Sequence, residues 1–391
     1  MAGIVVKPRA RIFHGHEWVY ASEIKKCFGN PGPGDVISLK DYKDRPLGSA
    51  IYNPSSQIVA RRFSRRKQDL DAEFFHRRIE RALAYRQNNR EISMDPCRIV
   101  WSESDGLPGV VIDRYGDHVV LQTLTLGMNQ RTELIAEAIN QALSPEGIVL
   151  RNDSPMRIAE GLRPETRVIA GKEPAITRLL IDEISFTIDL IGGQKTGLYL
   201  DQMSNYQLVA KYGKDSRVLD CFTNQGGFAL HAAAAGAESV IGVDSSSPAI
   251  SSAQENAEAS GLKNLKWIEA NVFDDLKERE SRNEEFGLII LDPPSFTRNK
   301  RSLNDALRGY KEIHLRALKM LPPGAILVTF TCSHHVTRKS FLEMVRDAAV
   351  DAKRTLRQVG TFRQRSDHPI NPCIPETEYL HGFAFEVLPA W

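Results

Sequence analysis

Three apolar segments in the second half of the chain run directly into polar loops, and this feature constrains the fold more than any other. The segments cover residues 218–220, 288–291 and 325–330, and the loops after them read Cys-Phe-Thr-Asn-Gln-Gly-Gly, Asp-Pro-Pro-Ser-Phe and Thr-Cys-Ser. In open α/β sheets, ligands bind at the carboxyl ends of the strands. We therefore expect one sheet edge that binds a nucleoside cofactor and presents a thiol and a carboxylate to a substrate.

Strand-like and helix-like segments alternate from about residue 195 onwards. This rhythm is typical of βαβ units, which form a parallel sheet with right-handed crossovers. The strands are expected at 217–220, 239–243, 265–269, 287–291 and 325–330, and two more at 354–363 and 379–388. The predicted fold class is therefore α/β, with a Rossmann-like domain in the second half of the chain.

The first half of the chain has a different pattern. Residues 1 to about 68 are β-like and broken by turns, which indicates a small β-barrel. Residues 71–88 place apolar side chains on one helical face and predict a bridging helix. Residues 97–190 mix strands with one helix, and apolar residues alternate over 180–190, so we expect an α+β domain there.

The composition excludes several classes of protein. Hydrophobic residues make up 42% of the 391 residues, which suits a packed globular chain. No apolar run is long enough to span a membrane, and the first residues lack the apolar core of a signal peptide. The five cysteines are scattered and show no metal-ligand spacing. We therefore expect reduced thiols, no metal site, no membrane contact and a cytoplasmic location.

Basic residues gather near the end of the predicted barrel, although the net charge of the whole chain is only +2. Arg61, Arg62, Arg65 and Arg66 form the densest run, and the predicted helix at 71–88 carries more arginines. A local basic stretch on a nearly neutral protein suits a polyanion, so these four arginines are predicted to bind RNA. Alternatively, the run is a solvated surface laced with salt bridges.

The loop after the first strand of the α/β region suits a nucleoside cofactor. Asp220 ends that strand, and Gly226 and Gly227 would let a cofactor approach the backbone closely. Asp244 ends the second strand, where a carboxylate can accept two hydrogen bonds from a ribose diol. This order fits S-adenosylmethionine better than a dinucleotide. Alternatively, the glycines begin an ordinary helix and Asp244 is an ordinary cap. The predicted cofactor site also includes Phe222, Asn224, Asn271, Val272 and Asp292.

Asp292 and Cys332 are the predicted catalytic residues. The prolines after Asp292 hold its backbone extended, and its carboxylate can hydrogen-bond the edge of a base on which Phe296 stacks. A thiolate that adds to carbon 6 of a pyrimidine makes carbon 5 nucleophilic, so Cys332 would act by covalent catalysis. Alternatively, Cys332 is a small buried hydrophobic residue. Cys221, inside the first loop, is expected to serve packing only.

These motifs resemble one family along the whole chain, the PUA-domain-containing, S-adenosylmethionine-dependent rRNA cytosine-carbon-5 methyltransferases. Gly15 to Ile24 is similar to the opening of that family's PUA domain, and Glu103 to Val110 is similar to its middle domain. Gly193 to Gln202 resembles the segment that enters its catalytic domain. Asp292 to Phe296 and Thr331 to Ser333 resemble its two active-site motifs.

The resemblance implies a PUA-like RNA-binding β-barrel at 1–70, a linker helix and α+β middle domain at 71–192, and a class I methyltransferase domain at 193–391. It implies S-adenosyl-L-methionine as the cofactor, a cytosine of large-subunit ribosomal RNA as the substrate and Cys332 as the nucleophile. The family usually carries an aspartate at the position of Asn271. A homodimer stays open. The resemblance also places four more residues near the cofactor, namely Lys195, Thr196, Gly197 and Tyr199.

Two other functions stay open at this point. Asp292 to Phe296, followed by Asn299 to Arg301, also resembles rRNA guanine methyltransferases, in which Cys332 would be uninvolved. The second alternative is a non-catalytic RNA-binding factor of ribosome assembly. A covalent adduct with RNA that contains 5-fluorocytosine separates the cytosine enzyme from the guanine enzyme, and cofactor binding separates both enzymes from the assembly factor.

Overall fold

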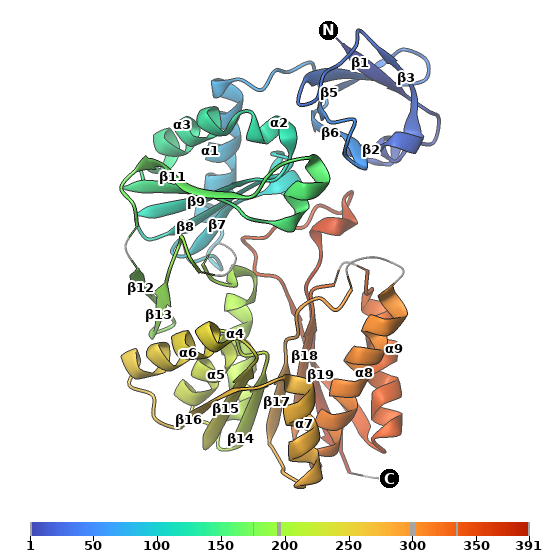
Figure 1. Ribbon diagram of the computed structural model, residues 1–391. Helices are drawn as coiled ribbons and strands as arrows, with labels where there is room; N and C mark the ends of the chain where they lie inside the picture. The colour runs from blue at the N-terminus through green and yellow to red at the C-terminus, as the bar shows by residue number, and fades with distance from the viewer. Residues whose placement is uncertain (1, 175, 194–196, 298–301, 334, 390–391) are drawn as a thin grey trace. The chain divides into compact units, whose positions relative to one another are not determined.

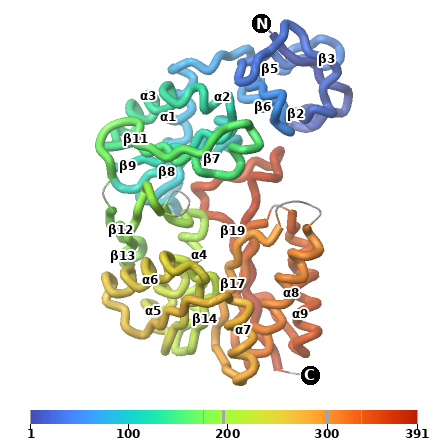
Figure 2. Tube along the Cα trace, in the orientation of Figure 1, coloured from blue at the N-terminus to red at the C-terminus, as the bar shows by residue number. Residues whose placement is uncertain are grey.

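The chain divides into two structural units, which are described one at a time (Figures 1 and 2). The computed structural model describes residues 2–174, 176–193, 197–297, 302–333 and 335–389. The first unit holds residues 1–177, 188–200 and 366–378, and the second holds residues 178–187, 201–365 and 379–391. This division joins most of the two predicted N-terminal domains in one unit, and the bounds of the three predicted domains stay a prediction.

A six-stranded sheet forms the N-terminal part of the first unit. In strand β4 (Val36–Lys40), Ile37 and Leu39 are fully buried and the residues between them are half-buried. Such alternation is what a strand with one face on a core requires. The strand order is β2-β6-β5-β4-β1-β3, with bounds β1 (Gly3–Val6), β2 (Trp18–Tyr20), β3 (Ile24–Phe28), β5 (Pro46–Tyr52) and β6 (Ile58–Ser64).

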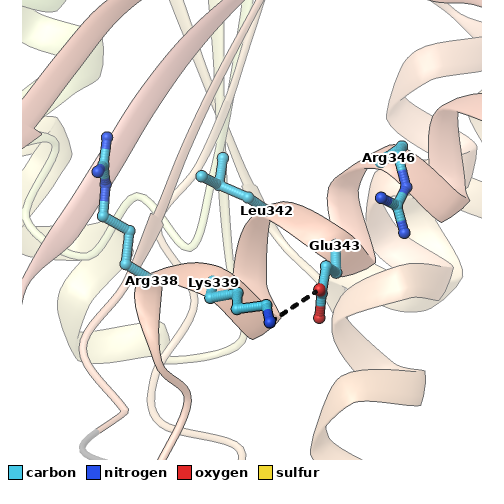
Figure 3. Close-up of a pocket in the computed structure, with 5 residues that line it drawn as sticks. All are labelled: Arg338, Lys339, Leu342, Glu343 and Arg346. Carbon is cyan, nitrogen blue, oxygen red and sulfur yellow. Dashed lines mark ion pairs between the residues drawn. The ribbon is translucent and has the colours of Figure 1, made fainter.

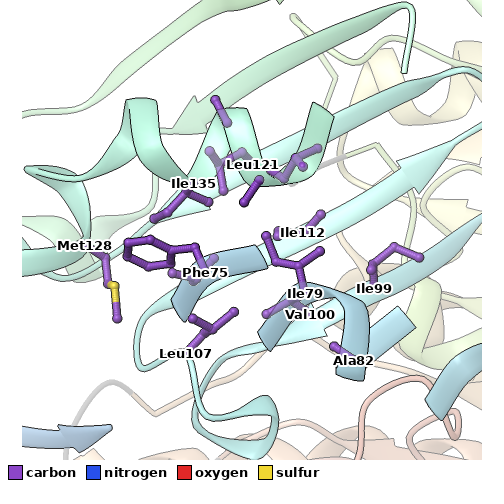
Figure 4. Close-up of a cluster of buried hydrophobic side chains, with 14 of the residues drawn as sticks. Phe75, Ile79, Ala82, Ile99, Val100, Leu107, Ile112, Leu121, Met128 and Ile135 are labelled. Atoms are coloured by element: carbon purple, nitrogen blue, oxygen red, sulfur yellow. The ribbon is translucent and has the colours of Figure 1, made fainter. Parts of the chain in front are cut away.

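A five-stranded sheet with helices packed on it forms the rest of the first unit. Helix α1 (Ala72–Asn88) begins where Asp71 Oδ1 accepts a hydrogen bond from the Phe74 backbone NH at 2.8 Å. Its apolar face, with Phe75 and Ile79, lies in the core over the sheet (Figure 4). The remaining elements are β7 (Cys97–Trp101), β8 (Val110–Tyr115), β9 (His118–Thr123), β10 (Gly147–Asn152), β11 (Glu165–Gly171), α2 (Leu126–Asn129) and α3 (Thr132–Leu143).

The segment with alternating apolar residues at 180–190 is a hairpin and not a single strand. Strands β12 (Thr177–Ile181) and β13 (Ile184–Ile188) form a two-stranded sheet. Asp182 and Glu183 between them have φ angles of 50° and 68°. Two residues with positive φ reverse the chain tightly. The alternation continues on both sides of this turn, which is why it hides the turn in the sequence.

A seven-stranded sheet organises the second unit and confirms the predicted α/β fold. Its order is β16-β15-β14-β17-β18-β20-β19, in which β14 to β18 are parallel and β20 is antiparallel to both neighbours. The seven strands occur close to their predicted positions. They are β14 (Arg217–Cys221), β15 (Ser239–Asp244), β16 (Leu265–Glu269), β17 (Leu288–Leu291), β18 (Ile326–Thr331), β19 (Thr355–Arg363) and β20 (His381–Leu388).

Helices cover both faces of this sheet. On one face, Leu327 of β18 lies in a core with residues of three helices: α7 (Val272–Ser281), α8 (Leu303–Lys319) and α9 (Arg338–Asp351). Successive strand residues point to opposite faces, and Phe330 accordingly stacks at 5.2 Å on Phe228 of helix α5 (Gly227–Ala234). Figure 1 shows the remaining helices of this unit, α4 (Met203–Ala210) and α6 (Ser247–Ala259), near α5.

Candidate active site

The carboxyl ends of strands β14, β15, β17 and β18 lie at one edge of the seven-stranded sheet. Cys221 of β14 pairs with Val243 of β15 and Leu291 of β17, and Leu291 also pairs with Thr329 of β18. The strand order reverses between β14 and β17, which is where α/β sheets bind ligands. The predicted adjacency of the strands before Asp292 and Cys332 is confirmed.

The loop between β14 and α5 has an unusual backbone. Phe222, Asn224 and Gly226 have φ angles of 63°, 49° and 86°. Non-glycine residues in this region are uncommon and gather at functional sites. A Cβ atom at Gly226 would lie 2.7 Å from Cη2 of Trp267, so the packing requires a glycine there. Gly227 is crowded as well, because its Cβ would lie 2.4 Å from a tyrosine ring. This tightly held loop suits close approach by a ligand.

Asp220 is fully buried at the end of β14. Its Oδ2 accepts hydrogen bonds from Thr223 Oγ1 at 2.5 Å and from the Ala229 backbone NH at 3.1 Å. Its Oδ1 has no donor among the residues that the structure describes. Burial raises the pKa of Asp220 to about 7, and the charges of Asp292 and Asp244 act in the same direction. Because a buried acceptor without a donor costs free energy, Asp220 fits a hydroxyl or ammonium group of a cofactor.

Asp244 ends β15 beside this loop. Its Oδ2 accepts a hydrogen bond from the Asn224 backbone NH at 2.9 Å, and its Oδ1 accepts one from Ser246 at 2.9 Å. Each carboxylate oxygen has a second lone pair, so the half-buried Asp244 can still accept from a ribose diol. Asn271 is exposed and caps helix α7 through a 2.9 Å hydrogen bond from the Phe273 backbone NH. Val272 next to it is buried in the core.

Asp292 follows β17, and the side-chain amide of a glutamine holds its carboxylate. Its Oδ2 accepts a hydrogen bond from Gln202 Nε2 at 3.0 Å, and Gln202 Oε1 in turn accepts one from Asn205 Nδ2 at 2.6 Å. Asn205 also donates to the backbone oxygen of Arg363 at 3.1 Å. Gln202 and Asn205 are 3% and 2% exposed, so this chain of amides fixes the carboxylate firmly. Local sequence patterns assign no role to Gln202 or Asn205, because their partners Asp292 and Arg363 lie 90 and 158 residues away.

The loop that carries Cys332 is joined to the loop that carries Asp292. Ser333 and Ser295 share a hydrogen bond of 2.9 Å between their hydroxyl groups. Tyr310 of α8 fixes the same loop, since its hydroxyl lies 3.0 Å from Ser333 Oγ. Cys332 is half-buried, whereas Cys221 is fully buried. Burial raises the pKa of Cys221 well above its ordinary value, which keeps that thiol neutral.

A neutral histidine hydrogen-bonds the strand and the helix that carry this loop and its Tyr310 contact. His314 of α8 is fully buried, with Nε2 2.8 Å from Thr329 Oγ1 and Nδ1 2.7 Å from the Tyr310 backbone oxygen. Burial lowers the pKa of His314 to about 4, so the ring is uncharged at neutral pH. His314 therefore positions β18 and α8. Two further histidines follow the Cys332 loop: His335 is half-buried, and His334 lies outside the described residues.

Phe296 is half-buried in a group of aromatic rings. Its ring packs at 4.6 Å from Tyr310, 5.8 Å from Phe273 and 6.3 Å from Phe222. It also contacts two of the buried cores of this unit. A ring with these neighbours serves mainly to anchor the Asp292 loop. The stacking of Phe296 on a base stays a prediction.

Four residues of the segment 195–199 are predicted to lie near the cofactor. Lys195 and Thr196 lie outside the described residues. Gly197 is buried with a φ angle of 136°, and Tyr199 is half-buried. Both belong to the first unit, whereas Asp220 belongs to the second. Their part in cofactor binding stays a prediction.

Two of the four arginines predicted to bind RNA are not available to do so. Arg61 is 12% exposed and pairs with Glu103 at 2.9 Å and Glu160 at 3.6 Å. Arg62 is 6% exposed and pairs with Glu17. Arg62 is buried, Arg61 is half-buried, and both are paired with acids, so the prediction that Arg61 and Arg62 contact phosphate does not fit the structure. Arg65 and Arg66 next to them are exposed.

A basic surface lies on helix α9 of the second unit (Figure 3). A shallow cavity of about 550 Å³ runs along it beside Arg338, Lys339 and Arg346. Glu343 pairs with Lys339 at only 3.9 Å and is the one acidic residue of this lining. Cations in the first turn of a helix oppose the helix dipole. Arg338 and Lys339 therefore destabilise helix α9 slightly. Helix α9 follows the Cys332 loop directly, which makes this surface a candidate for phosphate contacts.

The described residues show neither a metal-binding group nor a membrane-spanning helix. Their histidine, cysteine, aspartate and glutamate side chains form no group of three that could hold a metal ion. Within the same part of the chain, every helix is too short or too polar to cross a membrane.

Comparison with known proteins identifies the family. The ribosomal RNA large subunit methyltransferase I of Vibrio parahaemolyticus serotype O3:K6 is 38% identical over 380 residues, which cover 95% of this chain and 96% of that one. The protein of the same name from Photobacterium profundum is 39% identical over 376 residues, or 94% of each chain. The chain belongs to the ribosomal RNA large subunit methyltransferase I family. The predicted family resemblance is thereby confirmed.

Two further comparisons concern parts of the chain and the fold. Residues 4–65 match the family of PUA-like domains, and residues 202–353 match a family described as conserved hypothetical protein 95. A protein from Streptococcus mutans, described as a candidate SAM-dependent methyltransferase, has a TM-score of 0.85 at 22% identity and covers 99% of this chain and 100% of its own. A methyltransferase candidate crystallised with SAH has a TM-score of 0.86, also at 22% identity over 99% of this chain and 100% of its own. These likenesses support the same fold throughout the chain.

Proposed function

We propose that this protein transfers a methyl group from S-adenosyl-L-methionine to carbon 5 of a cytosine in large-subunit ribosomal RNA. The family to which the chain belongs supports both the methyl transfer and the class of RNA. The cytosine assignment rests on one observation, the hydrogen bond between Ser295 and Ser333. It ties the loop of Asp292 to the loop of Cys332, so that one base can meet a carboxylate and a thiol.

S-adenosyl-L-methionine, when bound, supplies an electrophilic methyl group. Asp244 would hold its ribose hydroxyls, because its oxygens keep free lone pairs beside a rigid loop. Asp220 would accept a further hydrogen bond through Oδ1, which has no donor among the described residues. The exposed amide of Asn271 would reach the adenine edge above the buried Val272. The orphaned oxygen of Asp220 is the strongest sign that a polar ligand belongs here.

The side chains at the sheet edge would act on the base in sequence. The Cys332 thiolate adds to carbon 6, which moves ring electrons toward carbon 5 and ring nitrogen 3. Asp292, fixed by Gln202, would act in its protonated form: it donates its proton to nitrogen 3 as the charge develops there, and takes the proton back when the thiolate leaves. Carbon 5 takes up the methyl group, a base removes the carbon 5 proton, and the freed electron pair expels the thiolate. One carbon–carbon bond replaces one carbon–hydrogen bond, and the carbon–sulfur bond is transient.

Exposed cations would guide the RNA. Arg65 and Arg66 on the PUA-like part and the basic surface of α9 are solvent-accessible, unlike Arg61 and Arg62. Such contacts hold the RNA backbone without reading its sequence. The target base is then selected by the sheet-edge pocket and by the fold of the RNA.

A methylation assay tests this proposal. The purified protein is incubated with methyl-labelled S-adenosyl-L-methionine and large-subunit rRNA from a strain that lacks the gene, and the digested nucleosides are resolved by mass spectrometry. We expect labelled 5-methylcytidine at one position. Labelled methylguanosine would replace the cytosine assignment with the guanine one. Cofactor binding or methyl transfer that is absent altogether would favour a non-catalytic assembly factor.

A further inference from the structure

A second concave site lies in the first unit, which holds neither of the residues assigned to catalysis. It is a cavity of about 230 Å³ lined by Arg62, Arg65, Arg78, Glu17, Glu103 and Gly106 among others. Three guanidinium groups and two carboxylates therefore face one small space. The charge that remains after these groups pair decides which ligand the cavity can take.

Both carboxylates of the cavity are already neutralised. Glu17 pairs with the buried Arg62 and lies 3.3 Å from Arg65 Nη2. Glu103 accepts hydrogen bonds from Arg61 Nη1 at 2.9 Å and from Trp18 Nε1 at 2.7 Å. Burial alone would raise the pKa of Glu103, but the charge of Arg61 and these hydrogen bonds outweigh it and lower the pKa. Neither acid is available to balance a further cation.

Arg78 of helix α1 is that further cation. Its Nη2 donates to the Phe63 backbone oxygen at 3.1 Å, and within the described residues it has no ion-pair partner. Burial and the nearby charges of Arg81 and Arg77 lower its pKa. Gly106, with a φ angle of 73°, makes room for the guanidinium, since a Cβ there would lie 2.9 Å from Nη1. A guanidinium has five donors, and Arg78 lines the cavity with its recorded hydrogen bond made to a backbone oxygen and not to an acid.

We propose that Arg78, with Arg65 at the rim, binds a backbone phosphate of the RNA in this cavity. The proposal rests on the proposed function, which makes RNA the substrate. Arginine suits the role because its planar fork can donate two parallel hydrogen bonds to a phosphate. Arg65 is 69% exposed and lies only 3.3 Å from a carboxylate that Arg62 already neutralises, so it can turn toward an anion. The site holds the backbone and reads no base.

Salt-dependent binding of an rRNA fragment tests the site. Arg78→Gln should weaken binding about tenfold or more, because it removes a charge-assisted contact. It should also lower the slope of log affinity on log salt by about 0.7–0.9, the value for one lost phosphate contact. The matched control is Arg81→Gln, since Arg81 is exposed on the same helix and does not line the cavity. Arg78→Lys should keep the slope and recover part of the affinity.

The outcomes separate this proposal from the proposed function. Failure of the proposed function means that the wild type transfers no methyl group to cytosine, whereas failure of this proposal shows only in the RNA-binding slopes of the variants and leaves methyl transfer by the wild type intact. A slope for Arg78→Gln equal to that of the wild type, or an equal loss for Arg81→Gln, overturns the phosphate site. If Arg78→Gln does not fold, the exposed Arg65→Gln makes the same measurement, and an unchanged slope there overturns the proposal. Competition by inorganic phosphate alone, with no change in the RNA slope, would assign the cavity to a free anion instead.

Discussion

The edge of the seven-stranded sheet and strand β6 of the first unit both concentrate charged side chains, but these charges are in opposite states. At the sheet edge, Asp220 keeps one buried oxygen without a donor in the described chain. On β6, the half-buried Arg61 and the buried Arg62 form ion pairs with Glu103 and Glu17. Buried charge with its partner present holds a structure together, and buried charge without one marks a place for a ligand. We therefore expect the first region to bind a ligand and the second to serve the stability of the fold.

The largest expected effect concerns the thiol of the sheet edge. Cys332→Ala should lower methyl transfer at least about a thousandfold, because the covalent route is lost, with cofactor and RNA affinities nearly unchanged. The control is Cys221→Ala, which changes a buried packing residue and should keep most of the activity. Single-turnover transfer of a labelled methyl group measures both. Substantial activity in Cys332→Ala would move the reading to the guanine alternative.

The next effect tests the structural role of β6. Arg61→Ala should destabilise the first unit by about 3–5 kcal/mol, because it leaves Glu103 and Glu160 as buried charges without their partner. Urea unfolding followed by intrinsic fluorescence measures the change. Arg66→Ala, at an exposed position on the same stretch, should stay within about 0.5 kcal/mol of the wild type. Equal stability of the two variants would show that Arg61 is dispensable to the fold.

A smaller effect concerns the ribose contact. Asp244→Ala should weaken S-adenosyl-L-methionine binding by about 1.5–3 kcal/mol, because it removes charge-assisted hydrogen bonds. Isothermal titration calorimetry measures this loss. Glu255→Ala removes an exposed acid from helix α6 of the same unit and should leave the affinity unchanged. Wild-type affinity in a folded Asp244→Ala protein would reject the assignment.

The smallest expected effect is a pH dependence set by Asp220. Its folded-state pKa of about 7 lies above the ordinary value of 3.8, so the folded state holds a proton that the unfolded state has released. The stability due to this group is complete below the unfolded pKa and is lost as the pH rises through about 7. The free energy of unfolding should thus fall by about 1 kcal/mol from pH 6 to pH 7. Asp220→Asn should remove this slope, and an unchanged slope would place the titration elsewhere.

The sequence predicts the elements and the sheet edge well, because local patterns determine them. The alternation of strands and helices places Asp220, Asp244 and Asp292 at strand ends, and the parallel register then brings their loops together. Contacts between distant residues are not encoded in such patterns. The Gln202 amide that holds Asp292 lies 90 positions away, and the acid that neutralises Arg61 lies 42 positions away. Charge runs such as that on β6 are therefore poor guides to a binding surface until their partners are known.

Trapping of the covalent adduct tests the central claim most directly. RNA with 5-fluorocytosine at the target position is incubated with the protein and S-adenosyl-L-methionine and then resolved on a denaturing gel. Fluorine at carbon 5 cannot leave as a proton does, so the thiol stays bonded to carbon 6. We expect a slowly migrating protein–RNA band for the wild type and for Cys221→Ala, and no such band for Cys332→Ala. A band that persists in Cys332→Ala, or a wild-type enzyme that methylates cytosine without any band, would contradict the central claim.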